Sequence, residues 1–315
     1  MQSLLLMVML GEDDAAVALS AKETAMQWLS IIEVYGEPVD FARVQQSLFP
    51  IAFFSQNHSK VEIALLAKNV TNAFSLSLRL IYPPEDTNSL QQLESLLEML
   101  KQFATHKIWK TRAAVLRFLA SFTFYHWIFL DDVLKQRIRD LVVSFLTDEQ
   151  REVQDMAKYT LRNLTHIERT ATVSKLSEDF RAQAQDARTK HPKFMRRLQR
   201  QEKDQEDDVE IAKTKERIKT NEKKMASSVL GMSAVILAFP YSVPSFVPPL
   251  FEELGRYLYL KHSTPTVSYL EKAVKDTLLE FKRTHQDNWL EIKANFTAEQ
   301  RDVFEDVLIS PSYYT

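Results

Sequence analysis

The fold is decided by the stretch DVLKQRIRDLVVSFLTDEQREVQDMAKYTLRNL, residues 132–164. Apolar residues recur every three or four positions from Asp132 to Leu146 and again from Asp148 to Leu164, which is typical of two amphipathic helices. Because the connection between them is very short, the two helices should be antiparallel neighbours. The small side chain of Ala157 lets a neighbouring helix approach the second of them. We therefore predict a packed helix pair.

The same helical pattern continues toward the N-terminus. Ser59 and Glu62 form a predicted capping box, and further helices are predicted at Leu90–Leu100 and Trp109–Phe129. Pairs of such helices resemble the units of HEAT and armadillo repeats, although their spacing is irregular. We predict an all-α fold, a HEAT/armadillo-like helical solenoid of paired antiparallel helices over residues 1–187, followed by a charged insertion.

The composition favours helices and excludes several classes of protein. Only four glycines occur in 315 residues, whereas β-rich and nucleotide-binding folds need glycine in turns and phosphate loops. The absence of cysteine excludes disulfides and thiolate metal sites. The apolar run Val229–Phe239 is too short to span a bilayer, so we expect no membrane partner. The apolar start, Met1–Leu10, lacks a basic signal-peptide region, and we interpret it as a core helix with upstream repeats missing.

The segment Arg188–Lys224 differs in kind, with 13 basic and 8 acidic residues among 37. Because it has too few apolar residues to bury much surface, we predict a flexible or partly helical insertion at residues 188–225. A nuclear localisation signal and a contact with nucleic acid or histones are alternative roles for it. These roles would depend on the basic residues at its start, which are Lys190, Lys193, Arg196, Arg197 and Arg200.

Residues 226–315 form a third predicted region, which is again helical. Ser245 is expected to cap a helix through Tyr259, and Thr264 with Pro265 should begin the next helix. Threonine accepts a hydrogen bond at the N-cap, and proline suits the first helical position because its missing N–H is not needed there.

The C-terminal end offers the sharpest signal in the sequence. A capping box at Thr297 and Gln300 predicts a last helix, which a short tail follows. A hydrophobic residue, a tyrosine and a residue with a free carboxylate make a compact docking peptide, because the rings bury apolar area and the carboxylate attracts a lysine. The candidate docking residues are Tyr313, Tyr314 and Thr315.

Catalytic chemistry is not visible in the sequence. The seven histidines show no metal-ligand spacing, and no known nucleophile motif occurs. His126 lies in an aromatic run and is predicted to be a core histidine. His285 is near Asp287 and Asn288, which we interpret as helix starters, and Trp289, a packing anchor. We expect no catalytic residue, metal, cofactor or small-molecule substrate, and hence a protein that is not an enzyme.

From about Ala226 to Thr315 the chain resembles the C-terminal domain of the large proteasome activator family, proteasome activator complex subunit 4 and its fungal counterpart. Weaker similarity extends back to Trp109. The matching residues are Val229-Leu230-Gly231, Pro240-Tyr241, Val243-Pro244, Pro248, Arg283-Thr284-His285, Asp287-Asn288-Trp289, Phe296-Thr297 and Ser310-Pro311-Ser312-Tyr313-Tyr314-Thr315.

The resemblance implies a regulator of proteolysis. Members of this family are long HEAT-like solenoids that form a dome over the end of the proteasome core particle. Their last three residues enter a pocket between α-subunits, where a lysine meets the terminal carboxylate, and binding promotes gate opening and ubiquitin-independent, ATP-independent proteolysis. It also implies a place in the nucleus and cytoplasm, a part in DNA repair and the α-subunit ring as partner. A scaffold or nuclear adaptor that binds nucleic acid, histones or chromatin through the basic insertion is the alternative.

This sequence departs from the family pattern in two places. Thr315 stands where the family more often has alanine, and we expect the change to be tolerated because the carboxylate matters more than the side chain. Animal members are described as reading acetylated histones with an Asn-Phe pair, where this chain has Glu168-Arg169. Glutamate cannot donate a hydrogen bond to an acetyl carbonyl, so acetyl-lysine binding is left unassigned.

Overall fold

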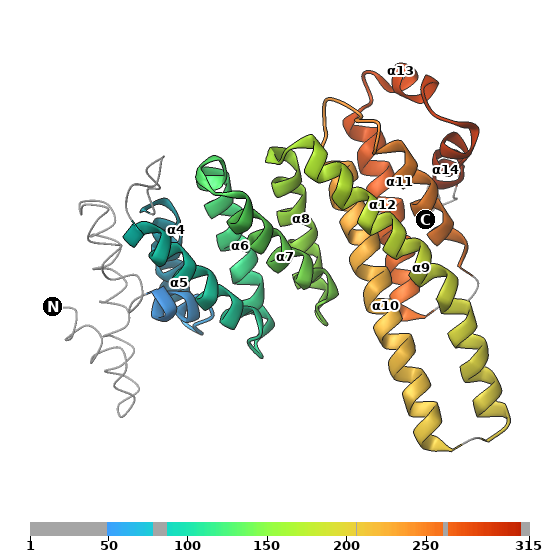
Figure 1. Cartoon of the computed structure of the whole chain (residues 1–315), viewed down its shortest axis with the longest axis horizontal. Coiled ribbons are helices and arrows are strands. Elements are labelled where there is room, and N and C mark those ends of the chain that lie inside the picture. The colour runs from blue at the N-terminus through green and yellow to red at the C-terminus, as the bar shows by residue number, and fades with distance from the viewer. Residues whose placement is uncertain (1–48, 78–86, 206, 261–263, 310–315) are drawn as a thin grey trace. The chain divides into compact units, whose positions relative to one another are not determined.

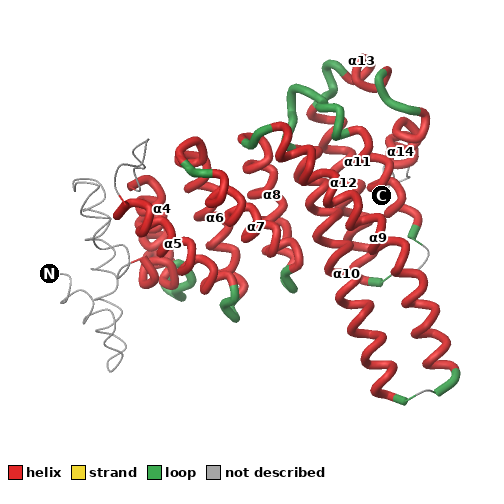
Figure 2. The backbone as a smooth tube through the Cα atoms, viewed as in Figure 1, coloured by secondary structure: helices red, strands yellow, loops and turns green. Residues whose placement is uncertain are grey.

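The described part of the chain consists of helices and the loops that connect them. The computed structural model describes residues 49–77, 87–205, 207–260 and 264–309. Helices connected by loops account for these residues, and no strand occurs among them (Figure 2). The all-α prediction is therefore confirmed, while the likeness to HEAT and armadillo repeats stays a prediction. None of the helices in the described ranges is long and apolar enough to cross a membrane.

The chain divides into two compact units, residues 1–142 and 143–315. In the first unit, helix α6 packs against both α4 and α5. Helix α7 begins in this unit and ends just beyond it. The helices are α4 (Val61–Ser77), α5 (Thr87–Ala104), α6 (Trp109–His126), the 3-10 turn η1 (Trp127–Phe129) and α7 (Asp132–Ser144).

Aromatic side chains form the core of the first unit. The ring of Phe49 lies 5.1 Å from that of Phe118 and 5.6 Å from that of Phe74, in edge-to-face geometry. His126, at the end of α6, is buried and its Nε2 lies 2.7 Å from the carbonyl oxygen of Ser75. The prediction that His126 is a satisfied core histidine is confirmed.

The second unit is built around α10. This helix packs against α8, α9 and α12, and every residue from Met225 to Leu237 is buried, as expected for a helix enclosed on all sides. Figure 1 shows α10 as one of the two long helices of this unit, the other being α9. The elements are the 3-10 turn η2 (Phe145–Thr147), α8 (Arg151–Ile167), α9 (Thr170–Lys203), α10 (Asp208–Leu237), α11 (Pro248–Gly255), the 3-10 turn η3 (Arg256–Tyr259), α12 (Pro265–Thr284), α13 (Trp289–Ala294) and α14 (Ala298–Ile309).

Helices occupy both halves of the stretch that led the sequence analysis. They are α7 and α8. Ala157 of α8 is buried, as are Val153 and Leu161 on the same helix. Because α7 belongs mainly to the first unit and α8 to the second, the pairing of these two helices stays a prediction.

The charged segment at residues 188–225 lies in two long helices. The boundaries expected at 187/188 and 225/226 fall inside α9 and α10, which run continuously across them. Helix α9 ends at Lys203 and α10 begins at Asp208, and the two helices lie side by side (Figure 1). They pack through small and polar residues that recur at helical spacing, among them Ala187 and His191 on α9 and Thr214, Ile218 and Asn221 on α10. Sparse apolar content therefore did not prevent regular helices.

Two predicted helix starts have different outcomes. Thr264 caps α12 as expected, since its Oγ1 accepts a 3.2 Å hydrogen bond from the N–H of Val267 and Pro265 follows. The cap expected at Ser245 is wrong. Helix α11 begins at Pro248 with Val247 at the N-cap position, because the two prolines that follow Val247 fit the first helical positions.

Candidate functional site in the C-terminal domain

An aromatic cluster fixes the last helix of the chain. Phe304 of α14 has its ring 5.0 Å from Phe251 of α11 and 5.1 Å from Trp289 of α13. Phe281 of α12 and Phe296, just before α14, complete the cluster. Four of these side chains are nearly fully buried and Trp289 is half-buried, so their packing holds α14 against the rest of the domain.

The start of α14 is fixed by the predicted capping box. The N–H of Thr297 donates to Oε1 of Gln300 at 3.0 Å, and the N–H of Gln300 donates to Oγ1 of Thr297 at 3.2 Å. The amide of Gln300 also donates to Glu252 of α11 at 2.8 Å. The prediction of this helix start is confirmed, and the same residues bind α14 to α11.

A glycine lets α11 and α14 come close together. A Cβ atom at Gly255 would lie 2.4 Å from Cγ2 of Val303, which is closer than carbon atoms approach. Hence no larger side chain fits at this position unless α14 moves. The domain specifies where α14 lies through a cap, an aromatic cluster and this contact.

The predicted docking residues follow this helix. Tyr313, Tyr314 and Thr315 lie outside the described residues, which end at Ile309, the last residue of α14. Their role stays a prediction. The structure shows the helix that precedes them, α14, and the contacts that hold it.

The His285 side chain is packed in the interior of the domain. His285 is buried with its ring 4.2 Å from that of Phe281, and its Nδ1 lies 2.9 Å from the carbonyl oxygen of Phe281. Asn288 stands at the N-cap position of α13 but makes no side-chain capping bond. Trp289 packs on Phe304 as the sequence predicted. The contacts of His285 are thus those of a packed side chain, with one ring nitrogen at a backbone carbonyl and the ring against a phenyl group.

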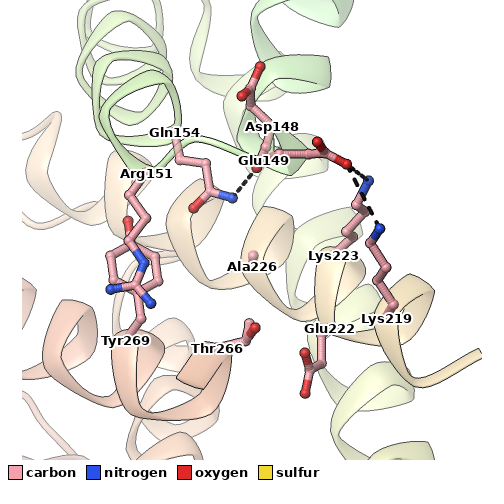
Figure 3. Close-up of a pocket in the computed structure, with 10 residues that line it drawn as sticks. All are labelled: Asp148, Glu149, Arg151, Gln154, Lys219, Glu222, Lys223, Ala226, Thr266 and Tyr269. Atoms are coloured by element: carbon pink, nitrogen blue, oxygen red, sulfur yellow. Dashed lines mark hydrogen bonds and ion pairs between the residues drawn. The ribbon is translucent and has the colours of Figure 1, made fainter. Parts of the chain in front are cut away.

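A polar pocket of about 350 Å³ lies between the start of α8, α10 and the start of α12 (Figure 3). The guanidinium of Arg151 lies 4.8 Å from the centre of the Tyr269 ring, in a cation–π contact. Glu149 approaches Lys219 and Lys223 at 3.9 and 3.8 Å. Sequence reasoning missed this pocket, because Arg151 and Tyr269 are far apart in the chain and no local pattern joins them.

The charged side chains that line this pocket are satisfied by the chain itself. Asp148 accepts a hydrogen bond from the N–H of Gln150 at 2.8 Å, and Glu222 accepts one from the hydroxyl of Thr264 at 2.7 Å. Burial and the nearby carboxylate of Asp155 raise the pKa of the Tyr269 hydroxyl, which stays protonated and donates to Asp155 at 3.0 Å. We interpret the pocket as a polar interface between the three helices, held by contacts among their own side chains. In the described ranges, no group of three or more His, Cys, Asp or Glu residues could hold a metal ion.

A buried ion pair connects the C-terminal domain to α9. Nε of Arg188 lies 2.8 Å from Oε1 of Glu253, and its NH2 group donates to the other carboxylate oxygen at 3.3 Å. The side chain of Glu253 is only 4% exposed, so this bidentate pair lies largely out of water. Helices α9 and α11 are thus connected by an ion pair whose two hydrogen bonds require a defined geometry.

Comparison with known proteins shows what this C-terminal domain is similar to. Residues 222–315 match the family described as proteasome activator complex subunit 4-like, C-terminal. Proteasome activator complex subunit 4B of Danio rerio is 32% identical over 96% of this chain and 15% of its own length. Proteasome activator complex subunit 4 of Homo sapiens is 33% identical over the same shares. Residues 222–315 are therefore similar to the C-terminal domain of the proteasome activator complex subunit 4-like family.

The resemblance seen in the sequence is thereby confirmed, and it reaches the fungal relative. Proteasome activator BLM10 of Saccharomyces cerevisiae is 30% identical over 33% of this chain and 5% of its own length. This chain spans about 15% of the length of the animal subunit 4 relatives. The family match begins at Glu222, so the proteasome activator complex subunit 4-like domain includes the buried half of α10 as well as α11 to α14.

Proposed function

We propose that this chain is a proteasome regulator that binds the end of the core particle through Tyr313, Tyr314 and Thr315. The observation that carries the proposal is the family match, which runs from Glu222 through the last residue of the chain. Relatives from zebrafish, human and yeast all have names that describe proteasome activators.

The chemistry of the tail suits a pocket between α-subunits. The ring of Tyr313 buries apolar area, and Tyr314 adds a second ring with a hydroxyl that can find a partner. A lysine and backbone N–H groups of the pocket would receive the carboxylate of Thr315, and charge-assisted hydrogen bonds of this kind are about twice as strong as neutral ones. The pocket then recognises two rings and one charge in a fixed order.

The described part of the domain supports this docking by fixing the helix before the tail. Because Phe304, the capping box and Gly255 specify the position of α14, the tail starts from a rigid element. A tail held by a rigid element loses less conformational freedom on binding than one held by a mobile segment. The proposal gives α11 to α14 a positioning role and assigns them no catalytic role.

The finer consequences of docking belong to the same proposal. Tail insertion promotes gate opening and ubiquitin-independent proteolysis without ATP hydrolysis, and the chain acts in the nucleus and cytoplasm. Because the chain spans so little of its relatives' length, binding and activation are separate questions.

The test is binding of the purified chain to purified proteasome core particles, measured together with hydrolysis of a fluorogenic peptide. Deletion of Tyr313–Thr315 should abolish binding. The matched control is Tyr241→Ala, which removes a tyrosine that is 94% exposed and far from the tail in the sequence, and which should bind as the unchanged chain does.

Each outcome has a defined meaning. Tail-dependent binding with faster hydrolysis makes the chain an activator, and tail-dependent binding alone makes it a docking module. Failure of the intact chain to bind, or equal binding after the deletion, would contradict the proposal.

A further inference from the structure

The hairpin of α9 and α10 projects from its unit. Figure 1 shows the end of α9 and the start of α10 extending past the other helices of the second unit. The segment Arg188–Lys224 carries 13 basic and 8 acidic residues, a net charge of +5, whereas the whole chain carries −2. The hairpin therefore carries net positive charge, although the residues at its projecting end are mainly acidic.

Four cations share one face of α9. Lys193, Arg196, Arg197 and Arg200 are spaced at i, i+3, i+4 and i+7, which places them on one side of a helix, and all four are exposed. The face toward α10 is marked by Ala187, whose carbonyl accepts a 2.9 Å hydrogen bond from Asn221.

At about 100° of rotation per residue, the four cations lie away from that interface. They span about 10 Å along the helix axis, at 1.5 Å per residue. We call this set of four residues the basic face.

Most other basic side chains of the hairpin are neutralised within the chain. Lys190 pairs with Asp186 at 2.6 Å and Lys215 with Glu202 at 3.3 Å. In contrast, Lys193, Arg196 and Arg200 form no ion pair with any described residue, and Arg197 has only a 3.7 Å contact with Glu210. The charge of the basic face is thus available to a partner.

We propose that the basic face binds the phosphate backbone of duplex nucleic acid without regard to sequence. Three of its four residues are arginines, whose planar guanidinium matches a phosphate group with two hydrogen bonds. A duplex carries one negative charge per about 1.7 Å of axis, so a row of about 10 Å meets several phosphates at once. The surface does not depend on the docking tail, so this proposal stands apart from the proteasome proposal.

The structure favours a duplex over other anionic partners. Proteins that bind single strands stack the bases on exposed aromatic rings, and the basic face has none. An acidic peptide lacks the regular spacing of phosphates. Histones are basic, so the same positive charge would repel them. The acidic residues at the turn, such as Asp207 and Asp208, limit the contact to the helix above them.

The test is fluorescence anisotropy of the full chain with a labelled, mixed-sequence DNA duplex of about two helical turns. Four phosphate contacts predict that log K falls against log salt with a slope of about −3.6, or on the order of 100-fold between about 50 and 200 mM salt. The variant R196Q/R197Q/R200Q retains one cation and should show a slope of about −0.9 and at least a tenfold loss of affinity at low salt.

The control variant is K213Q/K215Q/K219Q, which removes three paired lysines of α10 and changes the net charge by the same amount. Glutamine has a helix propensity close to that of lysine and arginine, so circular dichroism should show equal helix content in both variants. The control should bind within about threefold of the unchanged chain, because its lysines lie on α10, outside the basic face.

Three results would overturn the proposal. They are no duplex binding at low salt, an equal loss of affinity in the control, and equal or tighter binding to single-stranded DNA, to polyglutamate or to vesicles that contain phosphatidylserine. The last would assign the basic face to that other partner.

Discussion

At the scale of single residues, Gly231 of α10 lies against the buried ring of Phe180 in α9. A Cβ atom at this position would be 2.5–2.6 Å from three carbon atoms of the ring, so an alanine forces the ring to move. Alanine favours a helix by about 1 kcal/mol relative to glycine, whereas overpacking a core costs about 1–3 kcal/mol. We therefore expect Gly231→Ala to lower the free energy of unfolding by up to about 2 kcal/mol, as measured by urea denaturation.

The double variant distinguishes this clash from other causes. Phe180→Leu alone removes ring contacts and should destabilise the chain. In combination with Gly231→Ala, the Phe180→Leu substitution relieves the clash. The double variant should therefore lose less stability than the sum of the two single losses. Simple additivity, or a more stable Gly231→Ala chain, would show that the two residues do not crowd each other.

His126 makes stability depend on pH. Burial lowers the pKa of His126 below its ordinary value of 6.5, and its bond to the carbonyl of Ser75 offsets this only in part. Below pH 6.5 the unfolded chain binds a proton at this residue more readily than the folded chain. The free energy of unfolding should therefore fall as pH drops from about 6.5, by at most about 1.4 kcal/mol per pH unit from this residue.

The measurement is the urea midpoint from pH 5 to 8 for the unchanged chain and for His126→Gln. Glutamine keeps an N–H donor for Ser75 but does not titrate in this range. The substitution should therefore flatten the fall below pH 6.5. An identical pH dependence in the two proteins would show that His126 does not cause the fall.

At the scale of elements, the Arg188–Glu253 pair connects α9 to α11. Arg188→Met would leave the buried carboxylate with Arg256 alone, whose NH1 group is 3.3 Å away and half-exposed. Removing one member of a buried pair leaves a poorly compensated charge, so the free energy of unfolding should fall by about 3 kcal/mol. Adding Glu253→Met should recover most of the loss.

The control is Lys275→Met in the exposed Lys275–Glu271 pair, which should cost under about 1 kcal/mol. A loss that persists in the double variant would contradict this account.

Elements were predictable where the signal is local. The caps at Thr264 and at Thr297 with Gln300 involve residues three apart, and the structure has the bonds that the spacing implied. The hairpin was harder, because its interface contains Thr214 and Asn221, which a count of apolar residues treats as solvated. A partner helix that covers them and accepts the hydrogen bond of Asn221 appears only in three dimensions.

The candidate sites were likewise predictable only where their residues are close in the sequence. The tail residues were found because they are consecutive, and their role stays a prediction. The basic residues of α9 were also visible, but not the fact that Lys190 is paired while Lys193 is not. The pocket at Arg151 and Tyr269 left no trace in the sequence, because it joins residues from three helices.

At the scale of the whole molecule, the basic face and the tail should act independently. The cations at residues 193–200 lie beyond Arg188 on the projecting part of α9, so replacing them leaves the Arg188–Glu253 pair and the aromatic cluster of Phe304 intact. R196Q/R197Q/R200Q should therefore bind core particles as the unchanged chain does, and the chain without Tyr313–Thr315 should keep its affinity for duplex DNA. Both are measured with the two binding assays on the same preparations. If duplex DNA displaced the chain from core particles, the two surfaces would be competing for one contact, and the assignment of separate roles would be wrong.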